Sequence, residues 1–323
     1  MSIHDSLRAI AEHIQNNDDF LLIAHTSPDG DTLGCVLALC EAMRGMGKRV
    51  QVVCEQTVPR IYRFLPGSQR VLLPQQARPA PHTVALDCAD AERMGAARAL
   101  FEAAQTACNI DHHMTNRAYA GLNAVDGDAA AAGELVYELI GLLPWSMNAN
   151  AASCLYCALM TDTGNFAYAN TTPHTFRTAA ELLELGADNT NINRAVYRTV
   201  PLSKQRLLGT ALTNAIYLAN GAVGVTHITL EELARAGAKG EDIEGVIDHI
   251  RDVEGVEAAI LIREEQHGVY KVSLRSKRTA DVGAIAAAFG GGGHKQAAGF
   301  TARGNYGEVF TSVTELAQKA VEA

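Results

Sequence analysis

The sequence predicts an α/β protein with an N-terminal, mainly parallel sheet flanked by helices and a smaller C-terminal α/β domain with a mixed sheet. Three observations support this fold class. The chain has 323 residues, which is more than one hydrophobic core usually serves, so two domains are expected. In the N-terminal part, short apolar runs alternate with helical patterns, as in strand–helix–strand units. After a mostly helical stretch, alternating β-branched segments return near the C-terminus.

The periodicity of apolar residues predicts the N-terminal elements in order. A first amphipathic helix is expected to cover the strand that begins at Phe20. A later segment, rich in Pro and Gln, predicts a connection with little regular structure. The expected elements are a helix over residues 3–14, strands over 20–24 and 49–54, a helix over 32–45, the irregular connection over 59–81, strands over 83–86 and 107–110, and helices over 91–104, 129–143 and 148–160.

Helical patterns lead from the first domain into the second. No Gly/Ser-rich run interrupts them, so a helical linker is expected rather than a flexible one. We assign residues 1–190 to the N-terminal domain, 191–220 to the linker and 221–323 to the C-terminal domain. The expected elements are helices over residues 173–186, 189–199 and 202–218, a strand over 222–229, two helices, paired strands over 256–262 and 269–274, and a helix over 282–289.

The composition argues against several classes of protein. A formal net charge of −9 argues against a long duplex-binding surface, because such surfaces usually carry a basic stripe that displaces counterions from phosphates. The seven cysteines, an odd number at irregular spacings, favour reduced thiols over a disulfide framework. The N-terminus lacks a signal-peptide pattern, and no apolar run approaches the roughly 20 residues that span a bilayer. These features predict a cytoplasmic protein without a membrane partner.

Four apolar segments end in residue types that bind metals. The segments cover residues 20–24, 83–86, 107–110 and 157–161. The polar residues that follow them are His25, Asp29, Asp31, Asp87, Asp111, His112, His113 and Asp162. Single buried His or Asp residues are usually structural, but their recurrence at four element ends is hard to explain by packing. Because strands of a parallel sheet deliver side chains to its carboxyl edge, we expect a site there.

The residue types indicate the chemistry of this site. Hard divalent cations take carboxylate oxygens, and imidazole nitrogens shift the preference toward Mn²⁺ or another transition metal. Six side chains are too many for one ion and suit a pair, which can activate water and neutralise charge on a phosphoryl group. The candidate metal ligands are His25, Asp29, Asp31, Asp87, His112 and Asp162. The sequence therefore predicts a two-metal phosphoesterase site.

A glycine run near the C-terminus is the second unusual stretch. Four glycines at residues 290–293 precede His294 and Lys295, and we expect a helix to begin there. The Gly-Lys-Ser/Thr ending of a P-loop is missing. A flexible turn is the alternative interpretation. With Arg275 at the end of a nearby strand, the run predicts contact with a phosphate.

Taken together, these motifs resemble the DHH phosphoesterase superfamily, named for a triplet like that at residues 111–113. The four N-terminal motifs occur in family order as His25-x-x-Pro28-Asp29-x-Asp31, the strand-terminal Asp87, Asp111-His112-His113 and Thr161-Asp162-Thr163-Gly164. Arg275 and the run over residues 290–300 are similar to the DHH-associated C-terminal domain. The size of the chain and its GGGGHxxAAGF run most resemble the bifunctional oligoribonucleases and pAp phosphatases, often called nanoRNases.

The resemblance implies a role for each matched residue. One metal ion would be held by His25, Asp29 and Asp87, and the other by Asp31, Asp87, His112 and Asp162. The expected catalytic residues are His113, facing the substrate phosphate, and Asp111, orienting the imidazoles. Across an interdomain cleft, the nucleotide would be bound by Arg275, Gly292, Gly293 and His294. The implied cofactor is a pair of Mn²⁺ ions, with Mg²⁺ or Co²⁺ as substitutes.

The implied function is hydrolysis of short oligoribonucleotides, including dinucleotides such as pGpG, to mononucleotides. The same enzyme would hydrolyse 3′,5′-bisphosphate nucleotides such as pAp to AMP and phosphate, so its partners are short single-stranded RNA and small phosphonucleotides. The alternatives are a pyrophosphatase, a cyclic-dinucleotide phosphodiesterase or a single-strand exonuclease of the same superfamily, and a nucleotide-binding protein without turnover. The sequence leaves open the substrate preference, the direction of strand attack and the oligomeric state, a homodimer included.

Overall fold

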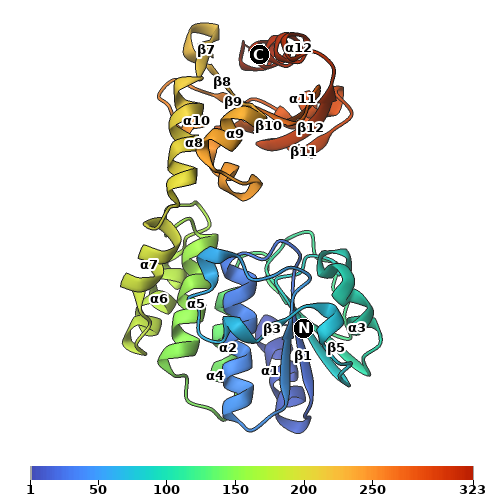
Figure 1. The fold of residues 1–323 in the computed structure, drawn as a ribbon. Helices are drawn as coiled ribbons and strands as arrows, with labels where there is room; N and C mark the ends of the chain where they lie inside the picture. The colour runs from blue at the N-terminus through green and yellow to red at the C-terminus, as the bar shows by residue number, and fades with distance from the viewer. Residues whose placement is uncertain (1, 323) are drawn as a thin grey trace. The chain divides into compact units, whose positions relative to one another are not determined.

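The computed structural model describes residues 2–322, and the chain divides into two compact units between Thr199 and Val200 (Figure 1). Each unit has its own sheet and its own hydrophobic core. The predicted α/β fold class, with a parallel sheet followed by a mixed one, is confirmed. The linker and domain boundaries drawn from the sequence remain a prediction. Among the helices of residues 2–322, none has the length and hydropathy needed to cross a bilayer.

The first unit is built on a parallel sheet of six strands in the order β3-β2-β1-β4-β5-β6. The strands are β1 (Phe20–Ala24), β2 (Val50–Val53), β3 (Val71–Leu72), β4 (His82–Leu86), β5 (Thr106–Asp111) and β6 (Leu122–Val125). The chain moves outward from β1 to β3 and then returns to β4 on the other side of β1. The strand order therefore reverses between β1 and β4, and ligands of such sheets collect at the carboxyl edge beside this reversal.

Helices cover the two faces of this sheet unequally. Leu22 and Ala24 face the core formed with α1 (Ile3–Asn16), α2 (Gly30–Gly45), α4 (Ala132–Gly141) and α5 (Ala149–Asp162). Leu21 and Ile23 face the opposite way, toward the 3₁₀-helical η4 (Ala91–Ala97) and α3 (Arg98–Glu102). Figure 1 shows α3 on the other side of the strands from α2 and α4. The remaining helices of this unit are η1 (Arg60–Tyr62), η2 (Ser68–Arg70), η3 (Pro74–Gln76), α6 (Pro173–Glu184) and α7 (Asn189–Tyr197).

The second unit contains a mixed sheet of six strands in the order β11-β12-β10-β9-β8-β7. Only β8 and β9 pair in parallel, and the other described neighbours are antiparallel. The strands are β7 (Ile216–Leu218), β8 (Val223–Ile228), β9 (Ala258–Gln266), β10 (Val269–Ser276), β11 (Gly292–His294) and β12 (Ala297–Arg303). The helices are α8 (Leu202–Thr213), α9 (Leu230–Ala236), α10 (Val246–Arg251), α11 (Val282–Ala288) and α12 (Tyr306–Glu322), with the 3₁₀ turns η5 (Ala219–Gly221) and η6 (Gly240–Ile243).

Two expectations about local structure are wrong. The glycine run does not lead into a helix, because β11 and β12 pair as antiparallel strands. Gly293 fits there because residues with a side chain rarely adopt its φ of +143°. In addition, a Cβ atom at this position would overlap Ala298. The expected helix over residues 202–218 stops at Thr213, and Ile216–Leu218 forms β7 instead.

A cluster of three rings lies where β1 and β4 begin. The ring centroids of His13 and His82 are 4.8 Å apart, and those of Phe20 and His82 are 5.1 Å apart. His13 Nε2 and His82 Nδ1 are buried and have no hydrogen-bond partner. Burial lowers the pKa of both imidazoles from the usual 6.5, and the nearby His82 lowers that of His13 further. Asp19 opposes this effect at His82 without reversing it.

This cluster predicts a loss of stability in acid. The unfolded chain takes up protons at His13 and His82 near pH 6.5, whereas the folded chain resists them. Their contribution to the free energy of unfolding is therefore fully present above that pH and is lost as the pH falls toward the lowered values. We expect urea unfolding at about pH 7.5 and about pH 5.5 to give a smaller stability loss for His13→Gln/His82→Gln than for the wild type. His267→Gln, at an exposed turn, serves as the control, and an unchanged loss in the double variant would contradict the prediction.

Candidate metal centre

The predicted metal-binding residues converge at the carboxyl edge of the first sheet. Ala24 pairs with Leu86, and Leu86 pairs with Ile110, so the residues that follow these three positions lie at one level. Those residues are His25, Asp87 and Asp111. The centre is completed by Asp29 and Asp31 where α2 begins, by Asp162 at the end of α5, and by His112 after β5. The structure thus brings together all six predicted metal residues.

Close helix packing fixes the approach of two of these carboxylates. A Cβ atom on Gly30 would overlap Thr161, and one on Gly34 would overlap the backbone carbonyl oxygen of Cys154. Helices α2 and α5 therefore approach more closely at the two glycines than side chains would permit. Asp31 and Asp162 lie at the ends of these helices, so their separation depends on the same packing.

The first group of candidate ligands surrounds the His25 imidazole. Its Nε2 atom lies 3.6 Å from Asp29 Oδ2 and 3.3 Å from Asp87 Oδ2. His25 Nδ1 lies 2.7 Å from the Thr26 carbonyl oxygen, which can only accept, so Nδ1 carries a proton and donates it. Nε2 is then the nitrogen that faces the two carboxylates and is available to a metal.

The second group surrounds the His112 imidazole. Its Nε2 atom lies 3.7 Å from Asp31 Oδ2, 3.5 Å from Asp87 Oδ1 and 3.5 Å from Asp162 Oδ2. His112 Nδ1 donates to the Ala129 carbonyl oxygen at 3.2 Å, which again leaves Nε2 for a metal. Asp87 faces both groups, with Oδ2 toward His25 and Oδ1 toward His112.

The electrostatics of these groups favour a cation. Complete burial and the nearby carboxylates of Asp87 and Asp162 hold the pKa of Asp31 well above its usual range. Burial also raises the pKa of Asp162 to about 6. Burial alone would lower the pKa of the two imidazoles, but the carboxylates around them raise the pKa of His25 to about 10 and that of His112 to about 10. The side chains of the centre therefore supply too little positive charge to balance its carboxylates.

The donor set fits two divalent cations. Asp87 Oδ1 is buried and has no hydrogen-bond donor. The separations of 3.3 to 3.7 Å between imidazole and carboxylate atoms exceed normal hydrogen-bond lengths, so these groups do not hold one another directly. The grouping also matches metal-ligand spacing, because the donor atoms of His25, Asp29 and Asp87 lie within 4.8 Å of one another, as do those of Asp31, His112 and Asp162.

His113 is held beside the centre by a different interaction. Its Nδ1 atom donates to Asp111 Oδ1 at 2.8 Å, and Asn116 Nδ2 donates to Asp111 Oδ2 at 2.6 Å. Burial would raise the pKa of Asp111, but these two hydrogen bonds lower it, so the carboxylate stays charged. Because Nδ1 is committed to Asp111, the other ring nitrogen of this half-exposed His113 remains for a ligand.

Several residues that shape the centre gave no recognisable signal in the sequence. Thr32 Oγ1 donates to the Leu86 carbonyl oxygen and accepts from His25 N, which joins the ends of β1 and β4. Asn170 Nδ2 donates to the carbonyl oxygens of Ala130 and Asp162. Such partners are set by the tertiary fold, although the Asp-His-His-x-x-Asn spacing could have suggested Asn116.

The predicted nucleotide-binding residues lie in the second unit. Arg275 is opposite Ala297 in the β10–β12 register, and His294 is opposite Ala297 in the β11–β12 register. Residues opposite one another share a face of a sheet, so Arg275 and His294 lie on the same face, two strands apart. Gly292 and Gly293 precede His294 in the exposed β11 strand.

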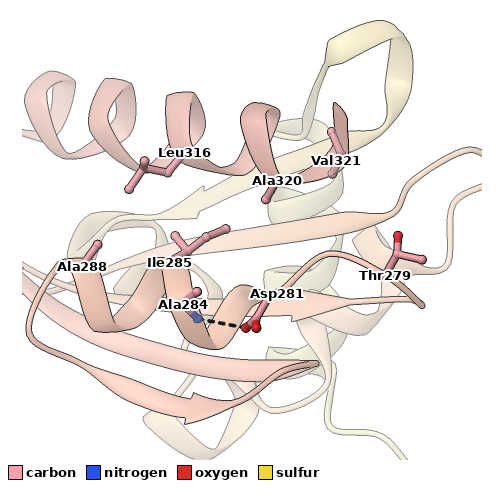
Figure 2. A pocket seen from close by; sticks show the side chains of 8 residues that line it. All are labelled: Thr279, Asp281, Ala284, Ile285, Ala288, Leu316, Ala320 and Val321. Carbon is pink, nitrogen blue, oxygen red and sulfur yellow. Dashed lines mark hydrogen bonds between the residues drawn. The ribbon is translucent and has the colours of Figure 1, made fainter. Parts of the chain in front are cut away.

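A pocket in the second unit lacks comparable chemistry. It has a volume of about 460 Å³ and lies between α11 and α12 (Figure 2). Its lining is mostly aliphatic, and its one ionisable side chain, Asp281, accepts a hydrogen bond from Ala284 N at the start of α11. The convergent carboxylates and imidazoles of the first unit are therefore the stronger candidate for a catalytic site.

Comparison with known proteins agrees with these features. Residues 19–159 match the model of the DHH family, N-terminal domain, and residues 221–323 match that of the DHHA1 domain. The bifunctional oligoribonuclease and PAP phosphatase NrnA of Thermus thermophilus is 36% identical over 304 residues, which cover 93% of this chain and 89% of the relative. NrnA of Bacillus subtilis is 27% identical over 285 residues, with coverages of 87% and 88%.

Solved structures share the fold. An exopolyphosphatase-related protein from Bacteroides fragilis superposes with a TM-score of 0.89 at 26% identity, covering 98% of this chain and 96% of that one. Exonuclease RecJ bound to manganese shares the fold more distantly, with a TM-score of 0.55 at 16% identity and coverages of 100% and 95%. The matched domains, the near-complete relatives and the convergent motifs show that the chain belongs to the DHH family.

Proposed function

We propose that this protein is a two-metal phosphoesterase that hydrolyses short oligoribonucleotides to mononucleotides and converts pAp to AMP and phosphate. The observation that carries the proposal is Asp87, whose two oxygens face two separate imidazole–carboxylate groups. That arrangement suits the two cations that phosphoryl transfer commonly uses. The substrates are supported by the Thermus thermophilus relative, which is 36% identical and bears the name bifunctional oligoribonuclease and PAP phosphatase.

The proposed ligand sets follow the two groups. His25, Asp29 and Asp87 would hold one ion, and Asp31, Asp87, His112 and Asp162 would hold the other. A mixed set of carboxylates and imidazoles favours Mn²⁺, with Mg²⁺ or Co²⁺ as substitutes. When bound, such a pair supplies Lewis acidity and neutralises charge that develops on the phosphoryl group.

The protein side chains would orient the substrate and manage one proton. His113 donates through Nδ1 to Asp111, and this hydrogen bond raises the pKa of His113 and favours its protonated form. Its Nε2–H can then donate to a phosphoryl or leaving-group oxygen, while Asp111 fixes the tautomer and the ring orientation. In the second unit, Arg275, His294 and the backbone N–H groups of Gly292 and Gly293 would bind another part of the nucleotide.

Replacing Asp87 tests the two-metal assignment. Asp87→Asn keeps the shape of the side chain but removes the charge shared by both groups. We expect it to lower Mn²⁺ content and kcat/KM for pAp more than Asp29→Asn does, and by more than the roughly 10- to 100-fold typical of losing an outer partner of a metal ligand. Asp128→Asn, at an exposed position, is the matched control. Normal turnover with two ions bound in Asp87→Asn would show the assignment to be wrong.

His294 tests the role of the second unit. His294→Ala should lower kcat/KM for pAp about 10- to 100-fold, the usual cost of losing a charge-assisted hydrogen bond, while Mn²⁺ content stays unchanged. The control is His267→Ala, another exposed histidine of this unit. Loss of Mn²⁺ from His294→Ala, or unchanged kinetics, would count against a substrate role.

Substrate length tests the proposed preference for short RNA. The chain carries a net charge of −9 and only 6% aromatic residues, whereas non-specific single-strand binders use a basic track with stacking aromatics. Each added nucleotide should therefore bring phosphate charge without a matching cation, and kcat/KM should be highest for about two to four nucleotides and then fall steeply. Assays of about 2-, 5- and 24-nucleotide RNAs, one substrate at a time, decide this. Equal or rising efficiency with length would favour a processive exonuclease.

A further inference from the structure

Arg93 lies beside the candidate metal centre but belongs to neither ligand group. Its guanidinium nitrogen Nη2 is 3.4 Å from His25 Nδ1. The residue lies on η4, the 3₁₀ segment that follows β4 and Asp87 on the side of the sheet opposite α2. It is the one Arg or Lys of residues 2–322 whose side chain lies within hydrogen-bond distance of a candidate metal ligand.

The backbone of this segment is fixed independently of the Arg93 side chain. Asp90 Oδ1 accepts from Arg93 N at 3.0 Å, and Thr26 N donates to the Arg93 carbonyl oxygen at 2.7 Å. Two residues later, Gly95 has a φ of +55°, and a Cβ atom there would overlap the Glu55 carboxylate. The turn is therefore anchored to the loop that carries His25, and it delivers the guanidinium to that position.

The contact with His25 does not give the Arg93 guanidinium a hydrogen-bond acceptor. His25 Nδ1 carries a proton, because it donates to the Thr26 carbonyl oxygen at 2.7 Å. The guanidinium of Arg93 only donates, so the 3.4 Å approach brings two donors together and is not a hydrogen bond. In addition, no carboxylate of residues 2–322 forms an ion pair with Arg93 within 4.0 Å. Arg98 on the next helix differs, because it pairs with both Glu92 and Glu102.

We propose that Arg93 binds a non-bridging oxygen of the phosphoryl group that reacts at the metal centre, an inference that rests on the proposed function. A guanidinium presents its N–H groups in a planar fork that matches two phosphate oxygens. Arg93 is an exposed cation with unused donors next to a candidate ligand, and the substrates are phosphate esters. Its position beside His25 makes it a phosphate-binding residue in the same unit as the metal ligands, independent of Arg275 and His294.

The experiment compares Arg93→Ala, Arg93→Lys and the control Arg98→Ala in the full chain loaded with Mn²⁺. Three quantities are measured: the Kd of inorganic phosphate by calorimetry, the steady-state kinetics on pAp, and the Mn²⁺ content. For Arg93→Ala we expect the phosphate Kd and the KM to rise about 10- to 100-fold at unchanged Mn²⁺ content. Arg93→Lys should recover part of the affinity, because it keeps the charge and loses the fork. Arg98→Ala should match the wild type.

Each other outcome is also decisive. Unchanged phosphate affinity and KM in Arg93→Ala, or phosphate that fails to bind the wild type, would overturn the proposal. Loss of Mn²⁺ from Arg93→Ala would overturn it as well, since Arg93 would then act by positioning His25. If the wild type turns over neither pAp nor a dinucleotide while phosphate binding still depends on Arg93, the proposed function fails and the phosphate-binding role stands.

Discussion

Repulsion among four carboxylates at one largely buried edge is the constraint on which the rest of the first unit depends. Asp31 and Asp87 are almost completely buried, and Asp29 and Asp162 lie close to them. The fold offsets part of this repulsion with backbone dipoles. Ala132 N and Gly133 N, at the start of α4, donate to the two oxygens of Asp31 at 2.7 and 2.9 Å. Helix N-termini favour negative charge, so α4 stabilises a carboxylate that the neighbouring groups disfavour.

Much of the fold and of the centre could be predicted because both depend on strand order. A parallel sheet places the ends of successive strands at one edge, so residues such as His25, Asp87 and Asp111 can be grouped from their position after apolar runs. Asp162 carries the same signal although α5 is a helix, since the apolar run before it also ends at the centre. The local sequence pattern is therefore sufficient to predict site residues wherever the fold brings the ends of strands and helices to the same place.

Other features depend on tertiary contacts that no local pattern carries. The glycines at residues 290–293 predict a helix N-terminus, with a flexible turn as the alternative, whereas the structure pairs β11 with β12 as antiparallel strands. Asn116 and Asn170 also donate to the carbonyl oxygens of Cys88 and Ala130, which lie in distant segments. The role inferred for Arg93 depends on assigning a proton to His25 Nδ1. That assignment depends on the contact between Nδ1 and the Thr26 carbonyl oxygen, which only the structure shows.

The glycine contacts between α2 and α5 have a consequence for the choice of metal. Backbone packing, rather than side-chain torsions, sets how far apart Asp31 and Asp162 begin, because Gly34 leaves no room for the helices to move closer and no side chain to hold them farther apart. His112 and Asp87 instead leave the ends of strands, where the chain turns and Asp87 adopts a φ of +59°. The packing of α2 against α5 therefore restricts the radius of the ions that Asp31 and Asp162 could contact together.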